Sequence, residues 1–86
     1  MTTDTTQTEL FDVIERFINE TREAKGMPGG FAITPGTSLV DGSAGIDSLD
    51  LAALVVELQT QTGKDPFAEG FVNFENAATL VALYSR

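Results

Sequence analysis

Residues 45–58 read GIDSLDLAALVVEL and predict a helix that begins within the stretch itself. Asp47 is a favoured N-cap residue, which makes Ser48 the first residue of the helix. Asp50 then lies in the first turn, where the positive end of the helix dipole favours negative charge. Apolar residues recur at helical spacing and form one face of the helix: Leu51, Leu54, Val55 and Leu58. Gly63 is the predicted stop, so the stretch sets a serine hydroxyl at the start of an amphipathic helix.

A first helix is predicted before this stretch, from Thr8 to Lys25. Thr6 and Glu9 have the spacing of a capping box, and Gly26 supplies the stop. Its apolar stripe consists of Leu10, Val13, Ile14, Phe17 and Ile18.

Two further elements are predicted after the stretch. Asp65 and Pro66 have the features of the start of a short helix. The chain closes with a longer helix, capped by either Asn73 or Asn76. Its apolar residues are Ala77, Leu80, Val81 and Tyr84.

The segment between the first two helices, residues 26–46, contains six glycines and two prolines, which excludes a long regular element. Apolar residues interrupt it, so we expect it to cross the helices as an ordered part of the core: Phe31, Ile33, Leu39 and Ile46. The predicted fold is all-α, a small four-helix bundle of three long helices and one short one with a long ordered loop between helices one and two. We expect residues 1–86 to form a single domain, with residues 1–7 as a disordered lead-in.

Composition narrows the possible functions. The 86 residues include 13 acidic and 5 basic side chains, giving a net charge of −8, and neither histidine nor cysteine. This charge disfavours nucleic acid and anionic membranes and favours protein partners with basic docking patches. The missing residue types exclude disulfides, thiolate chemistry and the usual proton shuttle near neutral pH. With no apolar run of membrane length and no signal-peptide pattern, we expect a cytoplasmic monomer without catalytic residues or a metal site.

Ser48 itself allows several interpretations. A hydrolase nucleophile would need a base to take its proton, and the chain has no histidine to offer. A calcium loop beginning at Asp41 would need a bidentate glutamate at its last position, where the chain has Ala52. A third interpretation is a small acidic adaptor that binds a partner through the apolar stripe of this helix, with Ser48 as an ordinary helix-start residue.

The wider segment Ile33–Phe67, ITPGTSLVDGSAGIDSLDLAALVVELQTQTGKDPF, resembles the acyl carrier protein and peptidyl carrier protein family. Residues 45–49 match the G-x-D-S-L motif that starts the second helix of these proteins, and Gly63 matches the end of that helix. Phe74 together with NAATLVALY, residues 76–84, matches their closing segment. The resemblance covers most of the chain and implies the same helical fold.

The resemblance implies that Ser48 is the attachment point of 4′-phosphopantetheine. In this family a phosphopantetheinyl transferase moves that group from coenzyme A onto the serine hydroxyl, and its thiol carries an acyl group as a thioester. Asp47 is implied as a contact for the transferase or its magnesium ion. The chain is then not an enzyme, because catalysis is left to partners such as an acyltransferase, a ketosynthase or an adenylating ligase.

Departures from the family pattern bear on the partner surface. The sequence DGSAGIDSL is one residue longer than the usual start of this helix, and Ala53, Gln59 and Thr60 stand where fatty-acid carriers have glutamates. We therefore expect a docking surface that relies more on apolar contact. Its implied members are Leu49, Asp50, Leu51, Ala53, Val56 and Glu57.

The weak acidity of this surface favours a discrete carrier of a polyketide or related secondary-metabolite pathway. The alternatives are a peptidyl or aminoacyl carrier of a nonribosomal pathway and a carrier of fatty-acid synthesis. We expect the cargo to shelter between helices where side chains are small or flexible, among Leu54, Leu58, Ala77 and Ala78.

Overall fold

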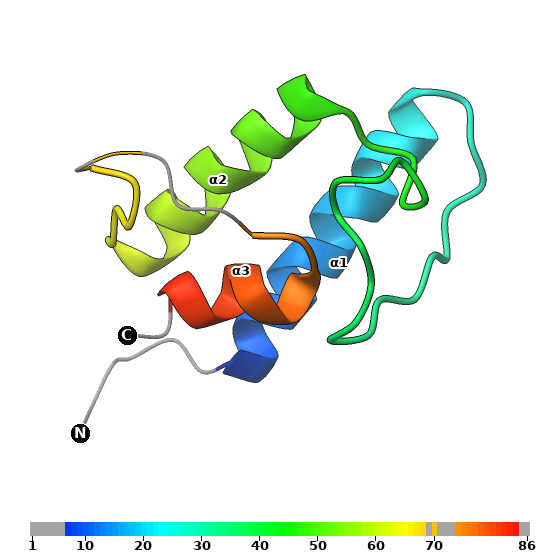
Figure 1. The fold of residues 1–86 in the computed structure, drawn as a ribbon. Helices are drawn as coiled ribbons and strands as arrows, with labels where there is room; N and C mark the ends of the chain where they lie inside the picture. The colour runs from blue at the N-terminus through cyan, green and yellow to red at the C-terminus, as the bar shows by residue number, and fades with distance from the viewer. Residues whose placement is uncertain (1–6, 69, 71–73, 85–86) are drawn as a thin grey trace.

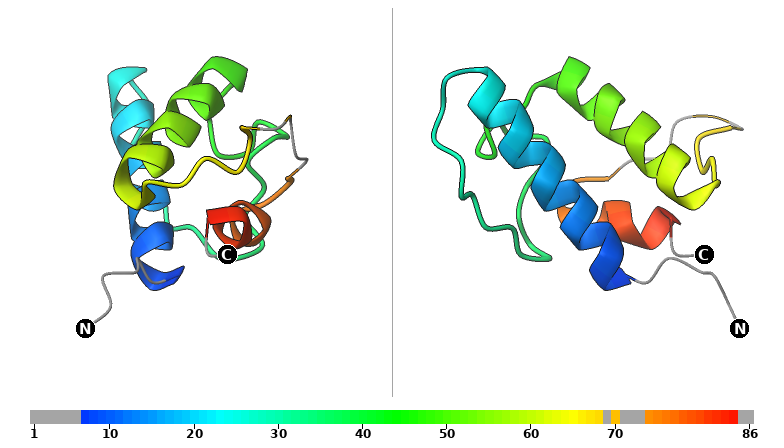
Figure 2. Two further views of the ribbon diagram at one scale, coloured as in Figure 1. Left: turned by 90° about the vertical axis from the view of Figure 1, so that its left-hand side faces the viewer. Right: turned by 180° about the vertical axis from the view of Figure 1, so that it is seen from behind.

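The computed structural model describes residues 7–68, 70 and 74–84. This part of the chain folds into three helices without a regular strand: α1 (Gln7–Ala24), α2 (Ser48–Thr62) and α3 (Ala77–Tyr84). Each helix contacts the other two, and the connection between α1 and α2 runs along one side of the molecule (Figures 1 and 2). The protein is therefore all-α, as predicted.

One core lies between the inner faces of the three helices. Its largest side chains are at most 1% exposed: Leu10, Ile14 and Ile18 of α1, Leu54 and Leu58 of α2, and Leu80, Val81 and Tyr84 of α3. The spacings of three and four residues that predicted the apolar stripes are the reason that these side chains share one side of each helix. Burial of a side chain of this size contributes roughly 1.5–3 kcal/mol to stability.

The first helix lies one residue earlier than predicted at both ends. Gln7 is already helical, so the predicted lead-in of residues 1–7 is too long by one residue; its remainder and the expected cap Thr6 lie outside the described residues. The helix ends at Ala24, and Gly26 follows with φ +82°, a left-handed conformation that glycine adopts without strain.

The predicted short helix after Pro66 is not confirmed. Over residues 65–68 the chain forms a turn, in which the N–H of Ala68 donates to the carbonyl of Asp65 at 3.2 Å. The Asp65 carboxylate accepts from the N–H of Phe67 at 3.2 Å, a local bond that forms in a turn as well as at a helix start. Residues 69 and 71–73 lie outside the described part, so the observed architecture is three helices and a turn.

Asn76 caps α3. Its side-chain oxygen accepts from the N–H of Thr79 at 2.9 Å, and the Thr79 hydroxyl accepts from the N–H of Asn76 at 3.1 Å. This reciprocal pair of bonds resolves one of the two predicted caps; Asn73 lies outside the described residues. With eight residues in its described length, α3 is shorter than the predicted long helix.

The loop between α1 and α2 packs as part of the core, as predicted. Leu39, Ala44 and Ile46 are at most 5% exposed. Backbone bonds join the loop to the segment before α3 and to its first residue, from Leu39 N–H to the Glu75 carbonyl at 2.9 Å and from Ala77 N–H to the Thr37 carbonyl at 3.0 Å. These bonds supply the partners that a buried irregular backbone needs.

Side chains of α1 hold the other half of the loop. The Asn19 amide donates to the carbonyl of Phe31 at 2.9 Å and accepts from its N–H at 2.6 Å. The carboxylate of Glu15 accepts from the N–H of Ile33 at 3.0 Å. A glycine-rich loop is thereby fixed to the helix without forming a strand.

Tyr84 makes stability sensitive to alkaline pH. Its hydroxyl donates to the Val55 carbonyl at 3.3 Å, and burial, with a smaller effect from the Asp65 carboxylate, raises its pKa to about 12. An unfolded tyrosine ionises near pH 10, so the unfolded chain loses this proton first as pH rises. The contribution of Tyr84 to the free energy of unfolding, followed by urea titration, should be constant below pH 10 and fall between pH 10 and 12. Tyr84→Phe should remove that fall; an unchanged alkaline slope in this variant would assign the effect to other groups.

Candidate functional site

Ser48 is the first residue of α2 and is exposed. The Asp47 carboxylate accepts from Asp50 N–H at 2.9 Å, and the Asp50 carboxylate accepts from Asp47 N–H at 3.0 Å. This capping box satisfies two of the four N–H groups that a helix start leaves without carbonyl acceptors. The other two belong to Ser48 and Leu49, and the Ser48 hydroxyl has no hydrogen-bond partner among the described residues. A hydroxyl and two backbone donors are thus available at one point of a rigid element.

Lys25, which follows α1, holds the start of α2. Its ammonium group pairs with the Asp50 carboxylate, lies 3.8 Å from Oδ2 of Asp47 and donates to the Gly45 carbonyl at 3.3 Å. The hydrogen bond between Lys25 and Asp50 lowers the pKa of Asp50 and raises the pKa of Lys25. Asp50, expected on the partner surface, is therefore also engaged within the chain.

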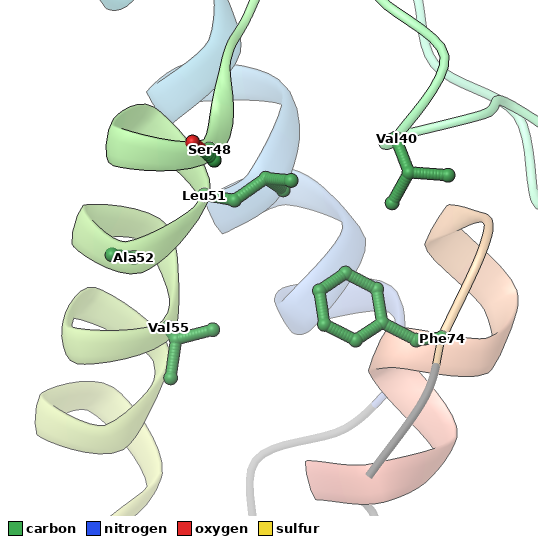
Figure 3. A pocket seen from close by; sticks show the side chains of 6 residues that line it. All are labelled: Val40, Ser48, Leu51, Ala52, Val55 and Phe74. Atoms are coloured by element: carbon green, nitrogen blue, oxygen red, sulfur yellow. The ribbon is translucent and has the colours of Figure 1, made fainter. Parts of the chain in front are cut away.

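An apolar pocket of about 260 Å³ opens beside Ser48 (Figure 3). It is lined by Val40, Ser48, Leu51, Ala52, Val55 and Phe74. Leu51 and Val55 project from α2 towards the Phe74 ring, and Val40 of the loop forms another side. Among the described residues of this lining, Ser48 contributes the one polar side-chain group, its hydroxyl.

This pocket differs from the predicted cargo shelter. Leu54, Leu58 and Ala77 are 0% exposed and fill the core, while Ala78 is half buried. The side chains that line the pocket lie on the neighbouring side of α2 and in two connecting segments. Helical spacing cannot show which apolar residues other segments leave uncovered, so this pocket could not be predicted from the sequence.

Four side chains form an exposed stripe along α2, which we name the outer stripe: Leu49, Ala52, Ala53 and Val56. Leu49 is 79% exposed and Val56 is 59% exposed, although both are large and apolar. The predicted partner residues Leu49, Ala53 and Val56 therefore lie together on one face.

The other predicted partner residues lie elsewhere. Leu51 is half buried and lines the pocket. Glu57 is half buried at the side of α2 nearest α1, where it borders a groove with Val13 and Phe17 and accepts a hydrogen bond from Gln61 at 2.9 Å. The structure thus separates Glu57 from the outer stripe.

The acidic residues of the loop bond locally. The Asp41 carboxylate accepts from the N–H of Ser43 at 2.9 Å and from its hydroxyl at 2.6 Å, and these bonds lower the pKa of Asp41. Within the described ranges, no group of three or more acidic side chains is arranged to hold a metal ion.

Sequence reasoning missed two features of this site. One is the pairing of Lys25 with the start of α2, for which the only signal was a cation near a helix end. The other is Val40 as a pocket wall, an apolar residue in a glycine-rich segment that was not singled out.

None of the helices in the described part of the chain combines the length and apolarity that a bilayer crossing requires. Comparison of the chain with protein-family models, curated proteins and solved structures found no match.

Proposed function

We propose that this chain is a discrete acyl carrier protein, in which Ser48 carries a 4′-phosphopantetheine arm. The observation that supports it most is the combination at one point of an exposed, unbonded Ser48 hydroxyl, a rigid helix start and an adjacent apolar pocket. A helix start favours the phosphate of such a group, because the N–H groups of Ser48 and Leu49 are unpaired and the helix dipole is positive there.

The attachment step needs only the hydroxyl from this chain. The Oγ of Ser48 forms a bond to the phosphorus of coenzyme A that bears the pantetheine unit, and the pyrophosphate P–O bond breaks. Adenosine 3′,5′-bisphosphate leaves, and the serine proton passes to a base of the phosphopantetheinyl transferase. Asp47 is exposed beside the hydroxyl and would help hold the magnesium ion of that transferase. When bound, the group supplies the thiol on which an acyl chain is carried as a thioester.

The outer stripe is the proposed docking surface for acyltransferase, ketosynthase or adenylating ligase partners. Exposed Leu49 and Val56 favour an apolar contact over a purely ionic one. This agrees with a polyketide or related secondary-metabolite pathway, in which the chain acts in the cytoplasm as a non-catalytic monomer. A peptidyl or aminoacyl carrier and a fatty-acid carrier share the same attachment chemistry and are the alternatives.

The pocket would shelter the apolar part of the cargo. Among the described residues that line it, the Ser48 hydroxyl is the one polar side-chain group, so cargo oxygens would lose hydrogen bonds to water on entering it. We expect amide signals of pocket residues to shift between the thiol form and a hexanoyl-loaded form in NMR spectra. Leu51→Asn should weaken these shifts and Ala53→Asn, on the outer stripe, should not. Unchanged signals on loading would show that the cargo stays in solvent.

A small acidic adaptor without a prosthetic group is the second candidate, favoured by the exposure of the outer stripe alone. Intact mass separates the two. The chain is incubated with coenzyme A and a broad-specificity phosphopantetheinyl transferase, and we expect a gain of one phosphopantetheine group on the peptide that contains Ser48. Absence of any gain, with a known carrier modified in the same reaction, would favour the adaptor.

A further inference from the structure

Two cations at the end of α1 converge on the residues just before and after Ser48. Arg22 donates from Nη1 to the Ala44 carbonyl at 3.1 Å, and Lys25 donates from Nζ to the Gly45 carbonyl at 3.3 Å. Lys25 also pairs with the carboxylate of Asp50, 25 residues away in the sequence. Two of the five basic side chains of this acidic protein are thus used at one short segment.

The segment that they hold needs such support. Gly42 and Gly45 have φ values of +85° and +79°, and the Gly45 N–H donates to the Gly42 carbonyl at 3.0 Å. Glycine gives the unfolded or frayed chain more conformations than any other residue, so this turn is costly to keep ordered. Lys25 contacts the segment on both sides of Ser48, through the Gly45 carbonyl before it and the Asp50 carboxylate after it.

Arg22 is a firm support for this arrangement. Its Nε donates to the Pro28 carbonyl at 3.1 Å, and the centre of its guanidinium group lies 4.8 Å from the ring centroid of Phe31. A Cβ atom at Gly45 would lie 2.8 Å from its Nη1, so the backbone approaches it closely. The guanidinium is therefore fixed from several directions, and Lys25 follows it by less than one helical turn.

We propose that Lys25, supported by Arg22, is a positioning residue for the modification of Ser48. The proposal rests on the proposed function. Lys25 keeps the capping box closed, so that Ser48 is presented on an ordered turn before the transferase binds. Its charge also offsets the carboxylate of Asp50, with which it pairs and which would otherwise repel the anionic phosphorus centre that Ser48 must attack.

The test measures kcat and KM for transfer from coenzyme A to the intact chain by a fixed transferase. Lys25→Met should lower kcat by about three- to tenfold, the size expected for losing an exposed charged hydrogen-bond pair. KM for the carrier should stay within about twofold, because Lys25 orders the reacting turn and is not the docking surface. Lys25→Arg should recover most of the rate. Lys64→Met makes the same charge change beyond the other end of α2 and should leave kcat unchanged.

Circular dichroism at the assay temperature checks that each variant is folded. If Lys25→Met is unfolded at that temperature, Arg22→Lys is measured in its place. This variant keeps the positive charge but loses the guanidinium group that donates to both the Ala44 and Pro28 carbonyls, and we expect a reduced kcat. Wild-type kcat in a folded Lys25→Met variant, a loss confined to KM, or an equal loss in Lys64→Met would each overturn the proposal. A wild-type chain that gains no phosphopantetheine would instead refute the proposed function, so the two failures are distinguishable.

Discussion

Ser48→Ala should abolish the gain of phosphopantetheine completely in the coenzyme A and transferase reaction. The substitution removes the hydroxyl at the start of α2 that can form the phosphodiester, since the neighbouring carboxylates of Asp47 and Asp50 could give only a mixed anhydride. It should change the free energy of unfolding by no more than about 0.5 kcal/mol, because the hydroxyl is exposed and unbonded and alanine is a good helix former. Intact mass spectrometry and urea denaturation measure the two quantities on the same sample.

The matched control is Ser43→Ala. Ser43 is also an exposed serine, and it lies five residues earlier, in the glycine-rich connection that leads into α2, where its hydroxyl donates to Asp41. This variant should gain the full mass of one phosphopantetheine group. If Ser48→Ala is still modified, or if Ser43→Ala alone is not, the attachment point is misassigned. If neither variant nor the wild-type chain is modified, the result favours the adaptor function.

The helices α1 and α2 could be predicted from the sequence because their signals are local. Apolar residues three and four positions apart identify the buried faces, and Asp47 and Gly63 are residue types that cap helix ends for stereochemical reasons. The structure confirms both caps, with Gly63 in the left-handed conformation at φ +71°. Asn76 could be proposed but not chosen, since the deciding bond to Thr79 depends on where α3 starts.

The turn after Gly63 shows where local signals mislead. Asp65 followed by Pro66 is typical of a helix start, and the same aspartate also forms a local turn through its carboxylate. Which outcome wins depends on the packing that follows. Here the centroid of the Phe67 ring lies 6.2 Å from the centroid of the Phe74 ring and 6.4 Å from that of the Tyr84 ring. Aromatic contacts to other segments therefore stabilise the turn.

Only the local part of the candidate site could be predicted from the sequence. The position of Ser48 at a helix start is a local property and follows from Asp47. The pairing of Lys25 with Asp50, and the pocket between α2, Val40 and Phe74, join segments far apart in the chain. A single sequence gives no direct signal of contacts between distant residues. Lys25 and the pocket walls could therefore be identified only from the folded structure.

Leu54→Ala should lower the free energy of unfolding by about 2–5 kcal/mol, the range for truncating a fully buried leucine. Leu54 is 0% exposed on the inner face of α2, and for a domain of this size such a loss is a large part of the total stability. Urea denaturation at neutral pH measures it. A change below about 1 kcal/mol would mean that the core collapses around the missing side chain or that α2 packs differently.

Leu49→Ala is the matched variant on the outer stripe of the same helix. Leu49 is 79% exposed, so its truncation should change the free energy of unfolding by less than about 0.5 kcal/mol. Under the proposed function it should slow acyl transfer to a partner enzyme, because it removes apolar area from the docking surface. Leu54→Ala should leave that transfer rate unchanged at temperatures where it stays folded. The opposite result would be a loss of stability in Leu49→Ala and slower transfer in Leu54→Ala. It would mean that Leu54 lies on the docking face of α2, so that partners reach Ser48 from the other side of the helix.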